Sequence, residues 1–129
     1  MHTVLVIEDI AALREHLRRI LQQEFDQPID IVEASDGTTG IKLAASLKPD
    51  LIIMDIGLPD LDGIGATKLI MEAQPNMRVV MLTSNSDQQR IMGALSAGAV
   101  GYILKDADPQ QMIMRLRSAV EPSVAAPTP

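Results

Sequence analysis

Three short runs of consecutive apolar residues constrain the fold of this chain more than any other feature. They occupy residues 4–7, 51–54 and 79–82, and each holds four apolar side chains in a row. A run of this length without polar alternation is typical of a strand that is buried on both faces of a sheet. Two weaker strand candidates are residues 29–33 and 101–104. The chain therefore has five candidate strands.

The segments between these strands have the apolar spacing of helices. Apolar residues recur there at intervals of three and four, which places them on one helical face. The fourth helix is predicted to begin with a capping box, Ser86 to Gln89, and the fifth with Asp108 as the N-cap before Pro109. The predicted buried faces comprise Leu13, Leu17, Ile20, Leu21 and Phe25; Ile41, Leu43, Ala44 and Leu47; Leu69, Ile70 and Ala73; Ile91, Met92 and Leu95; and Met112, Ile113, Leu116 and Val120.

A strand followed by a helix, five times over, predicts an α/β fold with a parallel sheet and helices on both faces. The length of 129 residues fits one domain, which we place at residues 1–120. Residues 121–129 contain three prolines, so they are predicted to form a linker to a further domain that this chain does not contain.

Composition narrows the classes of function. The formal net charge of −6 and an aromatic content of 2% argue against direct nucleic-acid binding, which needs clustered cations or stacking platforms. The absence of cysteine excludes disulfides and thiolate metal sites. The N-terminus lacks the pattern of a signal peptide, and no apolar run has the length of a membrane span. We therefore expect a cytoplasmic protein without membrane contact.

Polar residues follow four of the candidate strands at the point where each ends. Glu8 and Asp9 follow the first strand, Asp55 the third, Thr83 the fourth and Lys105 the fifth. The carboxyl ends of parallel strands share one edge of the sheet, where ligands bind in such folds. These side chains are therefore predicted to form a single polar site, with Lys105 at an exposed strand end.

The chemistry of this site follows from its charges. Two carboxylates about 4 Å apart repel by roughly 4 kcal/mol at an effective dielectric constant near 20. Lys105 offsets part of this repulsion, and Mg²⁺ is the natural cation for ligands that are all oxygen. Carboxylates, magnesium, a lysine and a hydroxyl suit phosphoryl transfer. Asp55 is predicted to be the nucleophile, with Thr83 and Lys105 holding the phosphoryl oxygens.

With these motifs the chain resembles the receiver domain of bacterial two-component response regulators. The resemblance rests on Glu8-Asp9, on the stretch 55–59 followed by Asp62-Gly63, on Thr83-Ser84, and on Tyr102 three positions before Lys105. It implies the flavodoxin-like fold, with five parallel strands in the order 2-1-3-4-5. The stretch 101–107 is similar to the NarL/FixJ subclass, whose regulators carry a C-terminal helix-turn-helix domain.

The resemblance also implies roles for individual residues. A sensor histidine kinase would be the phosphodonor and Asp55 the acceptor. Magnesium would bind Asp9, Asp55 and the backbone carbonyl of Gly57, with Glu8 assisting. Thr83 would move toward the phosphoryl group, and Tyr102 would turn inward. Promoter DNA would be bound only through the absent C-terminal domain, with a phosphorylation-dependent homodimer as one form of the output.

Several alternatives stay open at this point. Asp9 could instead cap the first helix, Asp62-Gly63 could be turn chemistry alone, and Tyr102 could be an ordinary half-buried strand residue. A phosphatase of the haloacid-dehalogenase type also uses an aspartate nucleophile and magnesium, but it places that nucleophile after the first strand. A single-domain receiver acting through protein contacts is the other alternative. We expect a phosphoacceptor with at most weak self-dephosphorylation, and no turnover enzyme.

Overall fold

A computed structural model describes residues 2–84 and 88–120 of the chain. Strands and helices alternate along these residues, as the apolar pattern predicts. The strands are β1 His2–Ile7, β2 Ile29–Ala34, β3 Leu51–Asp55, β4 Val79–Thr83 and β5 Gly101–Leu104. The helices are α1 Ala11–Gln23, α2 Gly37–Leu47, α3 Gly63–Ala73, α4 Gln88–Ser96 and α5 Pro109–Val120.

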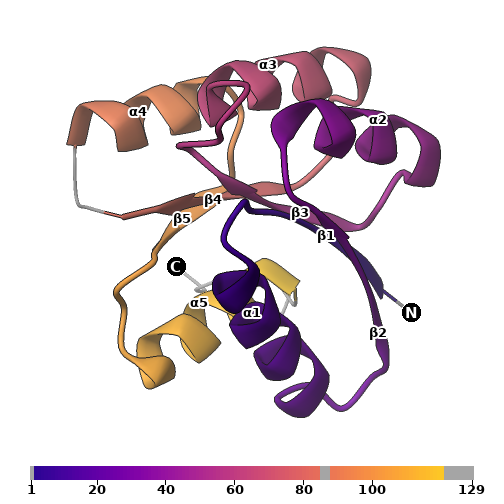
Figure 1. Ribbon diagram of the computed structural model, residues 1–129, viewed down its shortest axis with the longest axis vertical. Coiled ribbons are helices and arrows are strands. Elements are labelled where there is room, and N and C mark those ends of the chain that lie inside the picture. The colour runs from indigo at the N-terminus through magenta and orange to yellow at the C-terminus, as the bar shows by residue number, and fades with distance from the viewer. Residues whose placement is uncertain (1, 85–87, 121–129) are drawn as a thin grey trace, which may run out of the picture.

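The five strands form one parallel sheet in the order β2-β1-β3-β4-β5, so the predicted order and fold class are confirmed. Helices α2, α3 and α4 cover one face of the sheet, and α1 and α5 cover the other (Figure 1). The order places β1 beside β3, although α1, β2 and α2 separate them in the sequence. The acidic residues after these two strands therefore become neighbours.

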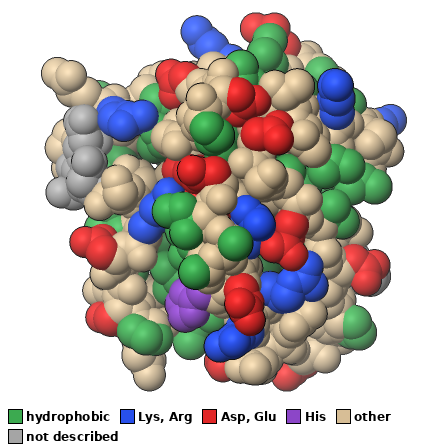
Figure 2. Space-filling model, viewed as in Figure 1, with side chains coloured by type: hydrophobic (Ala, Val, Ile, Leu, Met, Phe, Trp, Pro, Cys, Tyr) green, Lys and Arg blue, Asp and Glu red, His purple; other side chains and the backbone are tan. Residues whose placement is uncertain are grey.

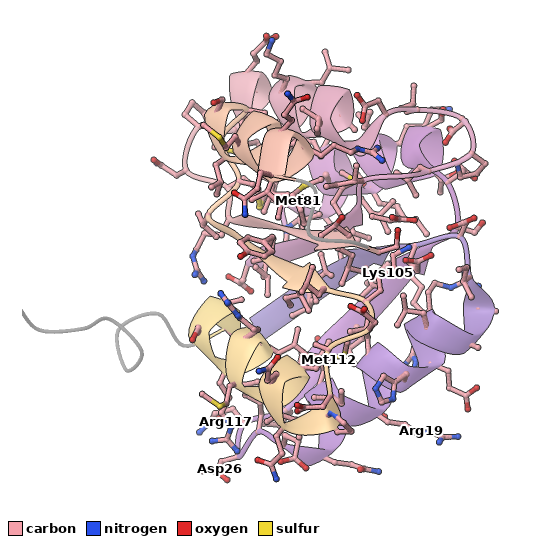
Figure 3. All side chains as sticks on the ribbon, turned by 90° about the vertical axis from the view of Figure 1, so that its left-hand side faces the viewer. Arg19, Asp26, Met81, Lys105, Met112 and Arg117 are labelled. Carbon is pink, nitrogen blue, oxygen red and sulfur yellow. The ribbon has the colours of Figure 1, made fainter. Side chains whose placement is uncertain are left out.

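The core has two layers, one on each face of the sheet. Alternate residues of the central strands enter opposite layers, because successive side chains of a strand point to opposite faces. Leu5 and Ile52 belong to the layer under α2–α4, whereas Val6 and Ile53 belong to the layer over α1 and α5. Figure 3 shows Met81 on the first side of the sheet and Met112, from α5, on the second.

The predicted helical faces are confirmed at their centres and wrong at several flanking positions. Leu17, Ile70, Ile91 and Leu116 are buried as expected. A helix can direct only one stripe of residues toward the sheet, and neighbouring positions fall outside that stripe. On α4, Ala94 occupies the stripe and the larger Leu95 does not. The predicted core residues that are instead exposed are Leu47, Leu69, Ala73, Met92 and Leu95.

The predicted helix starts have different outcomes. Asp108 caps α5 through its Oδ1, which accepts a hydrogen bond of 2.9 Å from the Gln111 N–H. The capping box begins at Ser86, which lies outside the described residues, as does the predicted linker at 121–129. Among the described residues, no helix is both long and apolar enough to cross a membrane.

The start of α3 lies directly against the end of β3. Gly63 is buried, and its N–H donates a hydrogen bond of 2.8 Å to the Ile56 carbonyl. A Cβ atom added at Gly63 would collide with the backbone carbonyl oxygen of Asp55 and would lie 2.8 Å from the Ile56 Cα. Because these are backbone atoms, neither can rotate away.

We predict that Gly63→Ala destabilises the protein by roughly 1–3 kcal/mol, as overpacking does. Gly65→Ala in the same helix is the matched control, because nothing lies within 4 Å of an added Cβ there. That change should stabilise the helix by about 0.5–1 kcal/mol. Urea denaturation of both variants checks the prediction, and equal midpoints would contradict it.

Candidate active site

Strand register brings the predicted polar residues to one edge of the sheet. Ile7 pairs with Met54, so Glu8 and Asp55 stand next to each other at the ends of β1 and β3. On the other side of β3, Asp55 pairs with Leu82, and Thr83 follows. Lys105 follows β5, and its N–H donates to the Thr83 carbonyl at 2.8 Å.

Lys105 joins two buried carboxylates. Its Nζ lies 2.9 Å from Glu8 Oε1 and 3.0 Å from Asp55 Oδ1. Glu8 is fully buried and Asp55 is 2% exposed. The Lys105 side chain is itself only 17% exposed, so the expectation of an exposed lysine at a strand end is wrong. Lys105 directly follows β5, and Figure 3 labels it at the level of the sheet, between the two layers of helices. The Lys105 side chain is buried because it pairs with acids at the ends of two other strands. The sequence of β5 alone does not predict these pairs.

The two oxygens of Asp55 have different surroundings. Oδ1 accepts a hydrogen bond of 3.0 Å from the Gly57 N–H in addition to the Lys105 contact. Oδ2 is buried and has no hydrogen-bond partner among the residues that the structure describes. A buried carboxylate oxygen without a donor is costly, so this oxygen is suited to a cation or an electrophile.

Asp9 completes a group of three acids. One oxygen each from Glu8, Asp9 and Asp55 can be chosen so that all three lie within 4.8 Å of one another. Three carboxylates and one ammonium leave a formal charge of −2, and hard oxygen ligands of this kind fit Mg²⁺. Asp9 does not cap α1, because the N-cap residue is Ile10 and no side chain caps that helix. The alternative role for Asp9 is therefore wrong.

The charges shift the protonation equilibria of the site. Burial raises the pKa of Glu8. The hydrogen bond between Asp9 and Glu8 lowers the pKa of Asp9. For Lys105, burial alone would lower the pKa, but the bonds to Glu8 and Asp55 outweigh it and raise the pKa. Without a cation, the surroundings of Glu8 therefore oppose its ionisation.

A second set of contacts fixes the acidic turn after β1, and the sequence analysis missed it. Arg14 on α1 donates a hydrogen bond of 2.6 Å from its Nη1 to the Glu8 carbonyl. Its Nε pairs at 3.2 Å with Glu33 of β2, which also pairs with Arg18. The four-residue spacing of the two arginines is the available signal. Their common partner becomes visible only when β2 is known to lie beside β1.

The loop between β3 and α3 is also fixed at both ends. Gly57 and Asp62 form an isolated antiparallel bridge, and the Asp62 side chain caps α3 by accepting from the Ile64 N–H at 3.1 Å. The interpretation of Asp62-Gly63 as turn chemistry is thus supported. Asp60 was not among the predicted functional residues, and its side chain accepts hydrogen bonds from the first residues of α2.

Thr83 and Tyr102 lie where the sequence places them. Thr83 is buried at the end of β4. Tyr102 pairs with Met81 in the sheet and packs, partly buried, against the core layer under α2–α4. The guanidinium of Arg115, on α5, lies 5.3 Å from the centre of the Tyr102 ring. The ring is therefore held between a core layer and a surface cation.

Charged side chains of both signs occur on the face that Figure 2 presents. Figure 2 shows acidic and basic side chains interspersed over the face that it presents, with apolar side chains among them. The formal net charge of −6 is thus not gathered into one area of this face.

The geometry agrees with a comparison of the chain with known protein families. The profile of the response regulator receiver domain matches residues 4–117. The chain belongs to the response regulator receiver family. The alternative of a dehalogenase-type phosphatase is therefore wrong.

The relatives that the chain matches include transcriptional regulatory proteins and a response regulator. The chain is 36% identical over 119 residues to the transcriptional regulatory protein LiaR of Bacillus subtilis, covering 92% of this chain and 56% of that protein. It is 33% identical over 117 residues to the nitrate/nitrite response regulator protein NarL of Escherichia coli K12, covering 91% and 54%. The chain thus spans about half the length of the curated relatives it matches.

Solved structures show the same fold. The response regulator domain of Thermotoga maritima CheB superposes with a TM-score of 0.82 at 33% identity, covering 99% of both chains. A LuxR-family response regulator of Aurantimonas sp. SI85-9A1 superposes with a TM-score of 0.83 at 27% identity, covering 92% of this chain and 84% of that one.

We predict that, in the metal-free protein, Glu8→Gln gains stability relative to the wild type as the pH rises. The folded-state pKa of Glu8 lies above its ordinary value of 4.5, so the stability linked to its proton is present below that pH. This stability is lost as the pH rises through the folded-state value. The glutamine keeps an oxygen for the Ile10 N–H, which donates to Glu8 at 2.9 Å, but it loses the ion pair with Lys105, so the prediction concerns the change with pH.

The measurement is urea denaturation in a chelator from pH 4 to pH 8. The stability of Glu8→Gln relative to the wild type should increase as the pH rises. Glu72→Gln is the control, because Glu72 is exposed on α3 and its profile should parallel the wild type. Parallel profiles for both variants would show that Glu8 carries no such penalty.

Proposed function

We propose that Asp55 accepts a phosphoryl group from a sensor histidine kinase and that this modification controls a transcriptional output. The observation that carries the proposal is the environment of the Asp55 carboxylate. One oxygen is held by Lys105 and the Gly57 N–H, and the other is buried beside two further acids with no donor among residues 2–84 and 88–120. Membership of the receiver family supports the same assignment.

Magnesium is the cofactor that this site would take. Asp9, Asp55 and the backbone carbonyl of Gly57 would hold it, with Glu8 assisting. When bound, the ion neutralises carboxylate charge and polarises phosphoryl oxygens. The unpartnered Asp55 oxygen and the grouping of three acids support this fit.

The transfer is a displacement at phosphorus. A carboxylate oxygen of Asp55 forms a bond to phosphorus while the bond to the kinase imidazole nitrogen breaks, and that nitrogen keeps the electron pair. The product is an acyl phosphate on Asp55. Lys105 then pairs with phosphoryl oxygens in place of the carboxylate, and the Thr83 hydroxyl donates to another.

The change at Asp55 would be reported through β4, β5 and α5. Thr83 ends the strand beside Asp55, and the next strand carries Tyr102. A shift of Thr83 toward the phosphoryl group would free space for the Tyr102 ring to turn inward. The Arg115 contact, which cation–π magnitudes put at about 0.5–1 kcal/mol at an exposed site, is weak enough to yield. A few kcal/mol of differential interaction suffices for such a shift.

The output that fits best is control of transcription by a longer regulator. Relatives such as LiaR and NarL bear the names of transcriptional and response regulators, and each is about twice the matched length. We propose that residues 121–129 lead into a helix-turn-helix domain that binds promoter DNA as a dimer. The native coding sequence tests this directly. A stop codon after Pro129 would instead favour a single-domain receiver that acts through protein contacts.

We predict that acetyl phosphate with magnesium labels Asp55 alone, as located by mass spectrometry of the modified peptide. Asp55→Asn should abolish the label, because the amide is not a nucleophile at this site. Asp30→Asn is the matched control, since Asp30 is an exposed strand residue, and it should label like the wild type. A stable label at the wild-type level in Asp55→Asn would refute the assignment.

We also predict that a beryllofluoride mimic of the phosphoryl group shifts amide resonances in β5 and α5. Tyr102→Phe keeps the ring and should retain these shifts, whereas Tyr102→Ala should reduce them at α5. The measurement is a heteronuclear amide spectrum with and without the mimic. Shifts confined to the loop after Asp55 would contradict this route of coupling.

A further inference from the structure

Asp60 is exposed in the loop between β3 and α3, yet both of its carboxylate oxygens have partners across the loop. Its Oδ1 accepts a hydrogen bond of 2.7 Å from the Gly37 N–H. Its Oδ2 accepts bonds of 2.9 Å from the Thr38 N–H and 2.6 Å from the Thr38 hydroxyl. Three donors from the start of α2 therefore converge on one side chain of a loop that is more than twenty residues distant in sequence.

Helix α2 also has a cap of its own. The Asp36 side chain accepts a hydrogen bond of 2.7 Å from the Thr39 N–H, which is the usual N-cap arrangement. Asp36 and Asp60 share the donors of the first turn, but only the Asp60 bonds join two separate segments. Removing Asp36 would affect the helix end alone, whereas removing Asp60 would also release the loop.

Apolar side chains also pack the loop between β3 and α3 against the start of α2. Gly37 is buried, and a Cβ atom added there would lie 3.0 Å from both Cβ and Cδ1 of Leu61. Leu58 is also buried under the loop. The loop is closed at its base by the Gly57–Asp62 bridge and tied near its tip by Asp60. Gly57, which donates to Asp55 Oδ1, lies within this closed segment.

We propose that Asp60 is a positioning residue that holds the loop of residues 56–62 against α2 and thereby sets Gly57 in place for magnesium binding and for phosphorylation of Asp55. The inference rests on the proposed function, because it assigns the Gly57 carbonyl to the magnesium site. Outer residues that orient metal ligands commonly affect metal affinity by tenfold or more. Asp60 acts through Gly57 and is not itself in the group of three acids at the site.

The hydrogen bonds of Asp60 with Gly37 and Thr38, which we call the Asp60 clamp, persist over the whole physiological pH range. The hydrogen bond from the Thr38 hydroxyl, followed by those from the Gly37 and Thr38 N–H groups, lowers the pKa of Asp60 to about 2. Asp60 therefore stays charged at any pH where the protein works, and its bonds are not a pH switch. By linkage, a cation that fixes the loop must also strengthen the contact with α2.

The experiment compares Asp60→Ala with Asp36→Ala in the chain of residues 1–129. Magnesium affinity is measured by amide shifts in a titration of the metal-free protein, and labelling by the rate with acetyl phosphate. Asp60→Ala should weaken magnesium binding by roughly tenfold and slow labelling in proportion. Asp36→Ala should lower the unfolding midpoint while keeping magnesium affinity within about twofold, because it leaves the loop tied.

Two further measurements separate positioning from stability. Hydrogen exchange of the Gly37 and Thr38 amides should quicken in Asp60→Ala, and in the wild type it should slow when magnesium is added. Thr38→Val removes only the hydroxyl donor and should weaken magnesium binding in the same direction by a smaller factor. This variant keeps the inference testable if Asp60→Ala fails to fold.

Each outcome decides the inference. Unchanged magnesium affinity in both Asp60→Ala and Thr38→Val would overturn it, as would an equal loss in Asp36→Ala. If the wild type itself is not labelled at Asp55, the proposed function fails. The magnesium titration and the amide exchange would still show whether Asp60 positions the loop.

Discussion

The ion pairs of Lys105 with Glu8 and Asp55, at 2.9 and 3.0 Å, are the interaction on which the arrangement of the site depends. The three residues come from strands β5, β1 and β3, so the pairs can form only when the sheet has its crossed order. Both carboxylates are almost fully removed from water, which is expensive for ions unless the partner charge is close. The lysine therefore reduces the repulsion between the carboxylates of Glu8 and Asp55 at this edge of the sheet.

One cation does not balance three acids, and the imbalance links stability to function. Burial raises the pKa of Glu8, whereas the pKa of Asp9 is lowered by its bond with Glu8. Ionisation of Glu8 is thus opposed by folding, whereas ionisation of Asp9 is favoured by it. The charge of the three acids is what attracts a divalent cation, and binding to the folded state alone would recover stability by mass action. Strained electrostatics at this edge are consistent with a site that is completed by its ligands.

The fold was predictable because its decisive features are local. Fully apolar runs identified β1, β3 and β4, and the residues directly after them were correctly assigned to one edge. Features that depend on contacts between distant segments were not predictable. The burial of Lys105, the Arg14–Glu33 pair and the Asp60 clamp each require knowledge of which strands and loops are neighbours. Likewise, apolar spacing could not decide that Ala94, and not Leu95, faces the core.

The two missed contacts have related consequences for how a signal could leave the site. Arg14 ties the acidic turn after β1 to β2, and Asp60 ties the loop after β3 to α2. Both anchors lie on the side of the sheet order that runs from β3 toward β2. On the opposite side, Tyr102 is held at the surface by a contact with Arg115, which is weaker than a set of charged hydrogen bonds. In the proposed switch, the contact between Arg115 and Tyr102 is therefore one that a change at Asp55 could break at low cost. An equilibrium shifts along contacts of this kind, because they cost little to change.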